Sequence, residues 1–327
     1  MRRRDFIRVI CGASPAWPWA ADAQQPGKVW RIGVVLATTP ERARYLTEGL
    51  EQGLADLGDV PGRNIVLLHQ FAGSQPDKIK DAIVSLLPQI DLLVAQGTVG
   101  AVGAKNVAGD MPTVFVGVGA PVEIGLVQSL AHPGGNMTGV TFEAAAETYG
   151  KRLQLLKEII PDLKRVAVLR AVGDPNVQFA MTSLDAAATE LGITLVPIDL
   201  KSAGDVETAF TKAKNSEAEA LLAIAGALTF TIDPEIADRA LAAHLPLCSA
   251  FRETVIAGGL VSLGPDLSAI TRQAAAQIDK IIKRAKPADI PVEQPTRYDL
   301  YINLKTARLL NLTIPPPLLA RADEVIE

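Results

Sequence analysis

The chain has 327 residues, 48% of them hydrophobic and 21% charged, which is the composition of a globular protein long enough for two domains. Its formal net charge of −4 at pH 7 argues against a phosphate-binding surface, so nucleic acid is not an expected partner. No run of about 18 apolar residues occurs, so the sequence predicts no direct insertion into a membrane.

Residues 1–23 have the features of an export signal. A basic segment that includes Arg3 and Arg4 precedes a modest apolar region, and an Ala-Asp-Ala segment with the small-x-small form of a cleavage site ends at Ala23. The arginine pair and the weakly apolar region resemble a twin-arginine signal. We therefore predict an exported, periplasmic protein from which residues 1–23 are removed after Ala23.

Strand and helix patterns alternate along the next part of the chain. Apolar runs without polar alternation suit strands that are buried on both faces, and leucines and isoleucines at helical spacing follow them after short connections. The expected strands are 32–37, 64–71, 91–95, 113–118 and 138–142, with helices beginning near Pro40, Pro76 and Gly97. This alternation predicts a parallel sheet with right-handed crossovers.

The same scheme repeats after a dense turn signal at His132–Asn136. The segment Arg165–Pro175 resembles Trp30–Pro40, with an arginine before the apolar run and a proline in the loop after it. The expected strands are 165–171, 194–200, 220–225 and 245–251, and the expected helices are 146–160, 177–191, 205–215 and 234–244. A strand at 260–265 and a helix at 267–284 then return to the first lobe, followed by a Pro-rich linker, a strand at 298–302 and a short helix.

The fold class predicted from these patterns is α/β, with two doubly wound parallel-sheet lobes joined by a hinge. The N-lobe is expected to comprise residues 30–140 and 264–290. The C-lobe is expected to comprise residues 141–263 and 291–327. A ligand held between two such lobes would be enclosed when the hinge closes.

Motifs for catalysis, nucleotide binding and metal binding are missing from the sequence. It contains neither a Walker-type phosphate loop nor a G-x-S-x-G elbow, and Gly117-Val118-Gly119 lacks the third glycine of a dinucleotide fingerprint. The three histidines are scattered and have no metal-ligand partner at close spacing. We therefore expect no catalytic residue, no cofactor and no metal site.

Small polar loops follow the carboxyl ends of the predicted strands, where α/β proteins bind ligands. Glycines there allow close approach to backbone N–H groups, and helix N-termini favour a carboxylate. For any single loop residue the alternative role is ordinary helix capping. The candidate ligand-binding residues are Thr38, Thr39, Gln96, Gly97, Thr98, Gly119, Ala120, Glu143, Asp174, Asn176, Gly226 and Phe251.

Three stretches resemble a known family: LVQSLAHPGGNMTGV at Leu126–Val140, GKRLQLLK at Gly150–Lys157, and the tail Gly258–Glu327. In these stretches the chain is similar to exported substrate-binding proteins of ABC transporters with the type I periplasmic-binding fold. The similar group is related to tryptophan- and tyrosine-binding components. The resemblance implies a monomeric periplasmic receptor that binds a small molecule between its lobes and delivers it to a membrane permease.

The chain departs from the family pattern at two positions. Members that bind amino acids tend to have aspartate where this chain has Ala120, and an aromatic residue where it has Leu263. Burying a ligand ammonium without a counter-charge is costly, so such a ligand would require Glu143 or Asp174 as its partner. The resemblance therefore leaves open an aromatic or hydrophobic amino acid and a related acid that lacks the ammonium.

Two other functions remain open at this stage. A sensor input protein would pass its ligand state to a membrane receptor rather than to a transporter. An enzyme on the same fold is disfavoured by the missing catalytic motifs. A repressor on the same fold is excluded by the export signal and by the lack of a basic DNA-binding module.

Overall fold

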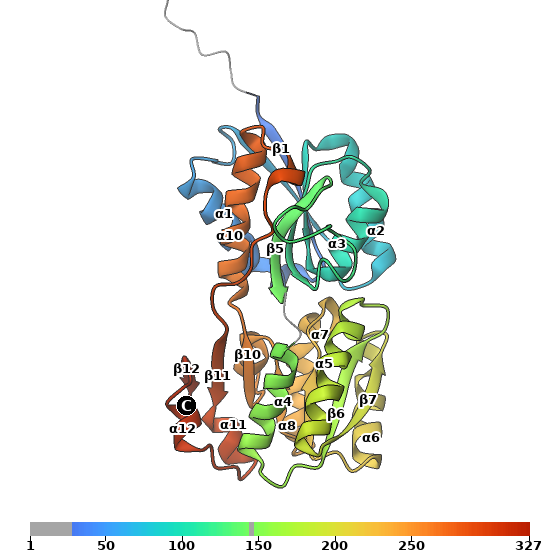
Figure 1. Cartoon of the computed structure of the whole chain (residues 1–327), viewed down its shortest axis with the longest axis vertical. Coiled ribbons are helices and arrows are strands. Elements are labelled where there is room, and N and C mark those ends of the chain that lie inside the picture. Colours follow the sequence, from blue (N-terminus) through green and yellow to red (C-terminus); the bar gives the residue numbers. More distant parts are fainter. Residues whose placement is uncertain (1–27, 144–146) are drawn as a thin grey trace, which may run out of the picture.

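The computed structural model describes residues 28–143 and 147–327. The predicted export signal and its cleavage after Ala23 lie outside the described residues, as does the first residue of the helix predicted from 146. The described chain forms two α/β lobes stacked end to end (Figure 1). None of the helices in these two ranges is both long and apolar enough to cross a membrane.

The N-lobe is built on a five-stranded parallel sheet in the order β2-β1-β3-β4-β5. Its strands are β1 (Trp30–Leu36), β2 (Ile65–Phe71), β3 (Leu92–Gln96), β4 (Thr113–Gly119) and β5 (Met137–Glu143). Side chains from Ile32 to Leu36 are almost fully buried, as expected of a central strand covered on both faces. The covering helices are α1 (Pro40–Asp56), α2 (Pro76–Leu86), α3 (Gly97–Val107) and α10 (Leu267–Ile282).

Helices α1 and α10 lie side by side although they are far apart in sequence (Figure 1). Two glycines on α1 allow the close approach. A Cβ atom added to Gly49 would lie 2.7 Å from Thr271 Oγ1, and one added to Gly53 would lie 2.7 Å from the Arg272 carbonyl oxygen. The segment predicted at 267–284 to return to the N-lobe is thus held there by the close packing of α10 against the backbone of α1.

The C-lobe is built on a seven-stranded sheet in the order β12-β11-β10-β9-β8-β6-β7. Its strands are β6 (Arg165–Ala171), β7 (Thr194–Leu200), β8 (Ala220–Ala223), β9 (Leu247–Ser249), β10 (Val261–Gly264), β11 (Asp299–Asn303) and β12 (Glu324–Ile326). Strand β11 runs antiparallel to β10, which departs from the purely parallel sheet predicted. The reason is topological: β10 leads out toward the N-lobe, and β11 brings the chain back.

The C-lobe helices are α4 (Glu147–Ile159), α5 (Asn176–Leu191), α6 (Val206–Asn215), α7 (Ala227–Thr231), α8 (Asp233–Ala242), α9 (Arg252–Ile256), α11 (Leu304–Leu309) and α12 (Pro316–Leu319). The predictions missed α7, α9, α12 and β12. Each has only three to five residues, which is too short to show a helical or strand period. Helix α7 matters most, because it forms part of the cavity between the lobes.

The two lobes meet later along the chain than predicted. Strand β5 remains in the N-lobe sheet as far as Glu143, so the predicted division after residue 140 falls inside a strand. The linker also belongs to the N-lobe beyond 290, because Val292 N donates to Leu130 O and Glu293 N donates to Gly139 O. The chain therefore crosses between lobes after β5, after β10 and between Glu293 and β11.

Candidate functional site

A small cavity of about 30 Å³ lies between the lobes, at the carboxyl ends of the parallel strands. It brings together part of the predicted set from both lobes. The predicted residues that line it are Gln96, Gly97, Thr98, Gly119, Asn176, Gly226 and Phe251. Residues from the N-lobe and the C-lobe face each other across it, so the cavity exists only when the lobes are together.

One side of the cavity is aromatic. The ring of Phe251 lies 5.4 Å from that of Phe142 and 5.1 Å from that of Phe230, centroid to centroid, in tilted and edge-to-face arrangements. Leu267, at the start of α10, adds to this apolar wall. Such an arrangement suits a flat or branched apolar group, because aromatic pairs favour offset and edge-on contacts.

The N-terminus of α3 forms a polar side of the cavity. Gly97 is its first residue and has a φ of +76°, a backbone conformation that glycine adopts without strain. The adjoining side chains hold the loops in place: Thr98 Oγ1 accepts from Gly119 N at 3.2 Å, and Gln96 Oε1 accepts from Ala37 N at 3.0 Å. Because the first N–H groups of a helix have no intrahelical partner, this end of α3 suits a carboxylate.

Formal charge is missing from the cavity wall. Among the described residues that line it, none is an aspartate, glutamate, lysine or arginine. The described residues also contain no group of three or more histidine, cysteine, aspartate or glutamate side chains that could hold a metal ion. Binding there would consequently rest on backbone groups, neutral polar side chains and apolar contact.

Thr38, Thr39 and Ala120 were predicted to contact ligand but do not line the cavity. Thr38 lies at the contact between lobes, where its Oγ1 accepts from Thr231 Oγ1 at 3.2 Å. Thr39 precedes α1 and makes no side-chain capping bond to that helix. Ala120 is fully buried with a φ of +47°, and its N–H donates to Glu143 O at 2.8 Å, so it supports the loop from behind.

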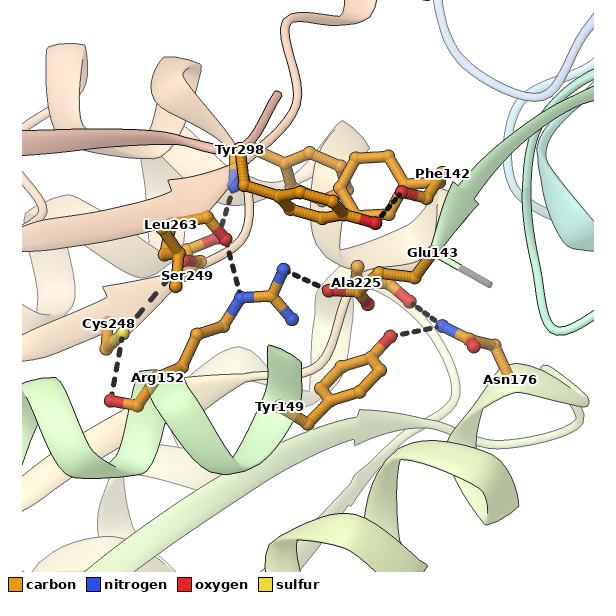
Figure 2. Close-up of polar contacts among 11 residues, drawn as sticks. Phe142, Glu143, Tyr149, Arg152, Asn176, Ala225, Cys248, Ser249, Leu263 and Tyr298 are labelled. Carbon is orange, nitrogen blue, oxygen red and sulfur yellow. Dashed lines mark hydrogen bonds and ion pairs between the residues drawn. The ribbon is translucent and has the colours of Figure 1, made fainter. Parts of the chain in front are cut away.

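Glu143 is also placed differently from the prediction, because its charge is used within the protein. Its Oε1 lies 2.5 Å from Arg152 Nη2, and both side chains are fully buried (Figure 2). Burial raises the pKa of the Glu143 carboxyl, whereas the Arg152 charge and the Tyr149 hydroxyl oppose that shift. With Arg152 as its partner, Glu143 is not the free counter-charge that a ligand ammonium would require.

Asp174 lies behind the cavity wall rather than in it. A Cβ atom added to Gly226, which lines the cavity, would lie 2.6 Å from Asp174 Oδ2, so the carboxyl packs closely against this glycine. Asp174 Oδ1 accepts from Asn176 N at 3.0 Å at the start of α5. Burial raises the pKa of Asp174 to about 6, and backbone hydrogen bonds oppose the shift.

This raised pKa predicts a pH-dependent cost in stability. The unfolded chain ionises Asp174 near pH 3.8 but the folded chain only near pH 6, so stability is lost as pH rises between these values. The loss approaches about 3 kcal/mol. We expect Asp174→Asn to remove this pH-dependent loss. The free energy of unfolding of the variant, measured with urea, should therefore rise relative to that of wild type from pH 4 to pH 7. A constant difference across that range would contradict the prediction.

Arg42 joins the two lobes at one end of the cavity. From α1 it places Nη2 2.7 Å from Asp233 Oδ1 at the start of α8, and it donates to Phe230 O at 3.2 Å. Its guanidinium also lies 4.7 Å from the centre of the Phe230 ring. Burial raises the pKa of Asp233 to about 7, and the charge of Arg42 opposes that shift.

Because these contacts form only between lobes, removing them is expected to weaken closure rather than either lobe. We expect Arg42→Met to lower ligand affinity by about tenfold, the equivalent of about 1.4 kcal/mol, with little change in the unfolding midpoint of the ligand-free protein. Calorimetric titration measures the affinity. Arg44→Met is the matched control, since Arg44 is on the same helix, is exposed and forms an ion pair with Glu48 of that helix rather than with the other lobe. Equal affinities for both variants would overturn the prediction.

Several cavity residues were not predicted from the sequence. They are Gly117, Phe142, Ala225, Ala227, Phe230 and Leu267. Gly117, Phe142 and Ala225 come from the ends of predicted strands, so the rule that selected their neighbours could have found them. Phe230 gave no such signal because it lies in α7, which is too short to predict.

Comparison with known proteins places this architecture in a family. A model of ABC transporter substrate binding proteins matches residues 32–326. The tyrosine-binding protein of Clostridioides difficile strain R20291 is 25% identical over 81% of this chain and 76% of its own length.

Solved structures show the same fold. A conserved domain protein from Vibrio cholerae superposes with a TM-score of 0.85 at 27% identity, covering 91% of this chain and 100% of that one. An ABC domain from Streptococcus pneumoniae in complex with L-Trp has a TM-score of 0.84 at 24% identity, covering 91% and 99%. The family match extends over nearly all of the described residues and both lobes, and we conclude that the chain belongs to the family of ABC transporter substrate binding proteins.

Proposed function

We propose that this protein is the exported binding component of an ABC uptake transporter, and that it captures a small carboxylate with an apolar, preferably aromatic, body. The family consists of substrate-binding proteins rather than enzymes. The observation that carries the proposal is the composition of the interlobe cavity. It is lined by three phenylalanine rings in mutual contact and by the N-terminus of α3, and it has no charged side chain among its described lining residues.

The physical argument follows from this composition. The apolar wall favours a hydrophobic body by about 25 cal/mol for each Å² it removes from water. Helix N-termini favour a carboxylate, and a closed, water-poor cavity strengthens that attraction. The named ligands of similar proteins, tyrosine and L-Trp, combine the same two features.

In this proposal residues 1–23 direct export to the periplasm, and ligand-induced closure presents both lobes to a membrane permease. Interlobe contacts such as Arg42–Asp233 and Thr38–Thr231 form in the closed arrangement. A ligand in the cavity adds contacts to both lobes and so shifts the hinge toward closure.

The test is to identify what the protein carries. Mature protein purified from its own periplasm is denatured, the released small molecules are identified by mass spectrometry, and the compounds found are titrated by calorimetry. Recovery of an apolar carboxylate that binds with micromolar or tighter affinity supports the proposal. Recovery of a sugar or a cation, or failure of every apolar carboxylate tried to bind, would refute it.

A further inference from the structure

Asn176 is a polar side chain of the cavity with a buried hydrogen-bonding atom that has no partner among the described residues. It lies at the start of α5 and is only 3% exposed. Its Nδ2 donates to Tyr149 Oη at 2.6 Å and to Ala225 O at 2.9 Å. Its Oδ1 is buried and has no hydrogen-bond partner among the described residues. A buried acceptor left in this state is costly, which is a reason to seek its partner in a ligand.

The orientation of this amide is determined by its neighbours. A backbone carbonyl only accepts hydrogen bonds, so the nitrogen of Asn176 must face Ala225 O. Turning the amide over would place two acceptors against each other and would leave Tyr149 without its donor. Figure 2 shows the amide nitrogen directed at Tyr149 and Ala225, with the oxygen pointing away from both.

Tyr149 is itself held by a buried ion pair. Its ring lies 4.8 Å from the guanidinium carbon of Arg152, which donates from Nε to Leu263 O at 2.8 Å and pairs with Glu143 (Figure 2). Burial, with the neighbouring Glu143 charge, raises the pKa of Tyr149 well above its usual value. The hydroxyl therefore stays protonated, with its proton available toward Glu143 and its oxygen available to Asn176.

Gly119 lies directly against Asn176 Oδ1. A Cβ atom at this position would lie 2.3 Å from that oxygen, across the boundary between lobes. Gly119 also donates its N–H to Thr98 Oγ1 in the first turn of α3. Asn176 Oδ1 and the N-terminus of α3, the proposed carboxylate site, are therefore both next to Gly119.

We propose that Asn176 Oδ1 accepts a hydrogen bond from a donor group next to the ligand carboxylate, and that Tyr149 is the positioning residue that keeps this oxygen turned toward the cavity. The inference rests on the proposed function, because it adds one requirement to the ligand proposed there. The ligand must carry a hydrogen-bond donor, which is an amino, amide or hydroxyl group, beside its carboxylate. A ligand without this group leaves Oδ1 desolvated and unpaired.

The experiment compares acids that differ only in this donor. Calorimetric titration of the mature protein uses matched sets: L-phenylalanine, L-3-phenyllactate and 3-phenylpropanoate, then L-tryptophan, indole-3-lactate and indole-3-propanoate. We expect wild type to bind the best donor-bearing acid of a set at least about tenfold more tightly than the acid without a donor. Because each set shares one carbon skeleton, the ratio reports the donor alone.

Tyr149→Phe tests the positioning role, since it removes only the hydroxyl. We expect the affinity ratio to fall about fivefold or more in this variant, with the acid that lacks a donor bound as in wild type. Tyr301→Phe is the matched control, because it removes a buried hydroxyl that bonds to Asp299 in the same lobe, away from Asn176. If Tyr149→Phe only destabilises the protein and Tyr149 does not position Asn176, the variant would bind all the acids more weakly by the same factor. The affinity ratio would then be unchanged.

The outcomes separate the inference from the proposed function. If wild type binds these acids but shows no preference for a donor, the inference fails and the proposed function stands. If no acid of either kind binds, the proposed function fails and the inference fails with it. Should Tyr149→Phe not fold, Asn176→Ala is measured in its place. A wild-type ratio retained in Asn176→Ala overturns the inference, and a ratio near one supports it.

Discussion

Replacing Arg152 with methionine is expected to destabilise the folded protein by about 3–5 kcal/mol, the usual cost of breaking a buried ion pair from one side. Arg152 and Glu143 are fully buried, and their closest atoms are 2.5 Å apart. Loss of the arginine leaves the Glu143 carboxylate in an apolar setting, and it also leaves Leu263 O without the Nε donor. The pair spans the lobe boundary, so both the C-lobe and its junction with β5 are affected.

Urea unfolding of the ligand-free protein measures this cost. The double variant Arg152→Met with Glu143→Leu is expected to recover much of the lost stability, because no buried charge then remains without a partner. Arg321→Met provides the control for an exposed pair, since Arg321 and Glu158 lie 3.3 Å apart at the surface and such pairs contribute about 1 kcal/mol or less. A change below about 1 kcal/mol for Arg152→Met would contradict the expectation.

Gly119→Ala is expected to lower ligand affinity by about tenfold to a hundredfold while each lobe stays folded. The added methyl group would lie 2.3 Å from Asn176 Oδ1 and 2.8 Å from its Cγ, so the lobes must move apart to accept it. Overpacking of this kind costs about 1–3 kcal/mol, and here the cost falls on the closed state, because Gly119 and Asn176 belong to different lobes. The ligand must supply that energy when it closes the hinge.

Calorimetric titration and small-angle X-ray scattering together test this prediction. The variant should show weaker binding and, at saturating ligand, a larger radius of gyration than wild type. Gly135→Ala is the matched control, since Gly135 is in the same lobe and a Cβ atom there meets nothing within 4 Å. If Gly119→Ala and Gly135→Ala bind equally well, the contact between Gly119 and Asn176 does not govern closure.

Most of the regular elements could be predicted from the sequence because their signals are local. Strands β1, β2, β6 and β7 are apolar or alternating runs of seven residues, and helices such as α10 carry a clear helical period. The errors fall where local signals end. The predicted lobe division after residue 140 falls inside strand β5, which completes the N-lobe sheet, and α7 was missed because five residues show no period.

The candidate site was predicted in part, and the pattern of errors is informative. The rule that ligands bind at the carboxyl ends of strands found residues such as Gln96, Gly119 and Asn176, which line the cavity. The same rule placed Glu143 and Asp174 at the ligand, whereas each is used inside the protein. Position at a strand end does not specify the direction of a side chain. The sequence pattern is therefore the same for a carboxylate buried inside the protein and for a residue that lines the cavity.

The sequence by itself determined the α/β class, the two lobes and the resemblance to the substrate-binding family, because apolar runs, helical periods and family segments are properties of contiguous residues. Only the tertiary structure decided which groups meet. Arg152 reaches Leu263 O, 111 residues away, and Asn176 bonds to Tyr149, 27 residues away. The partner of a buried polar group is set by how strands from different parts of the chain converge at the hinge. That convergence pairs Glu143 with Arg152 and brings Asn176 Oδ1 close to Gly119 of the other lobe.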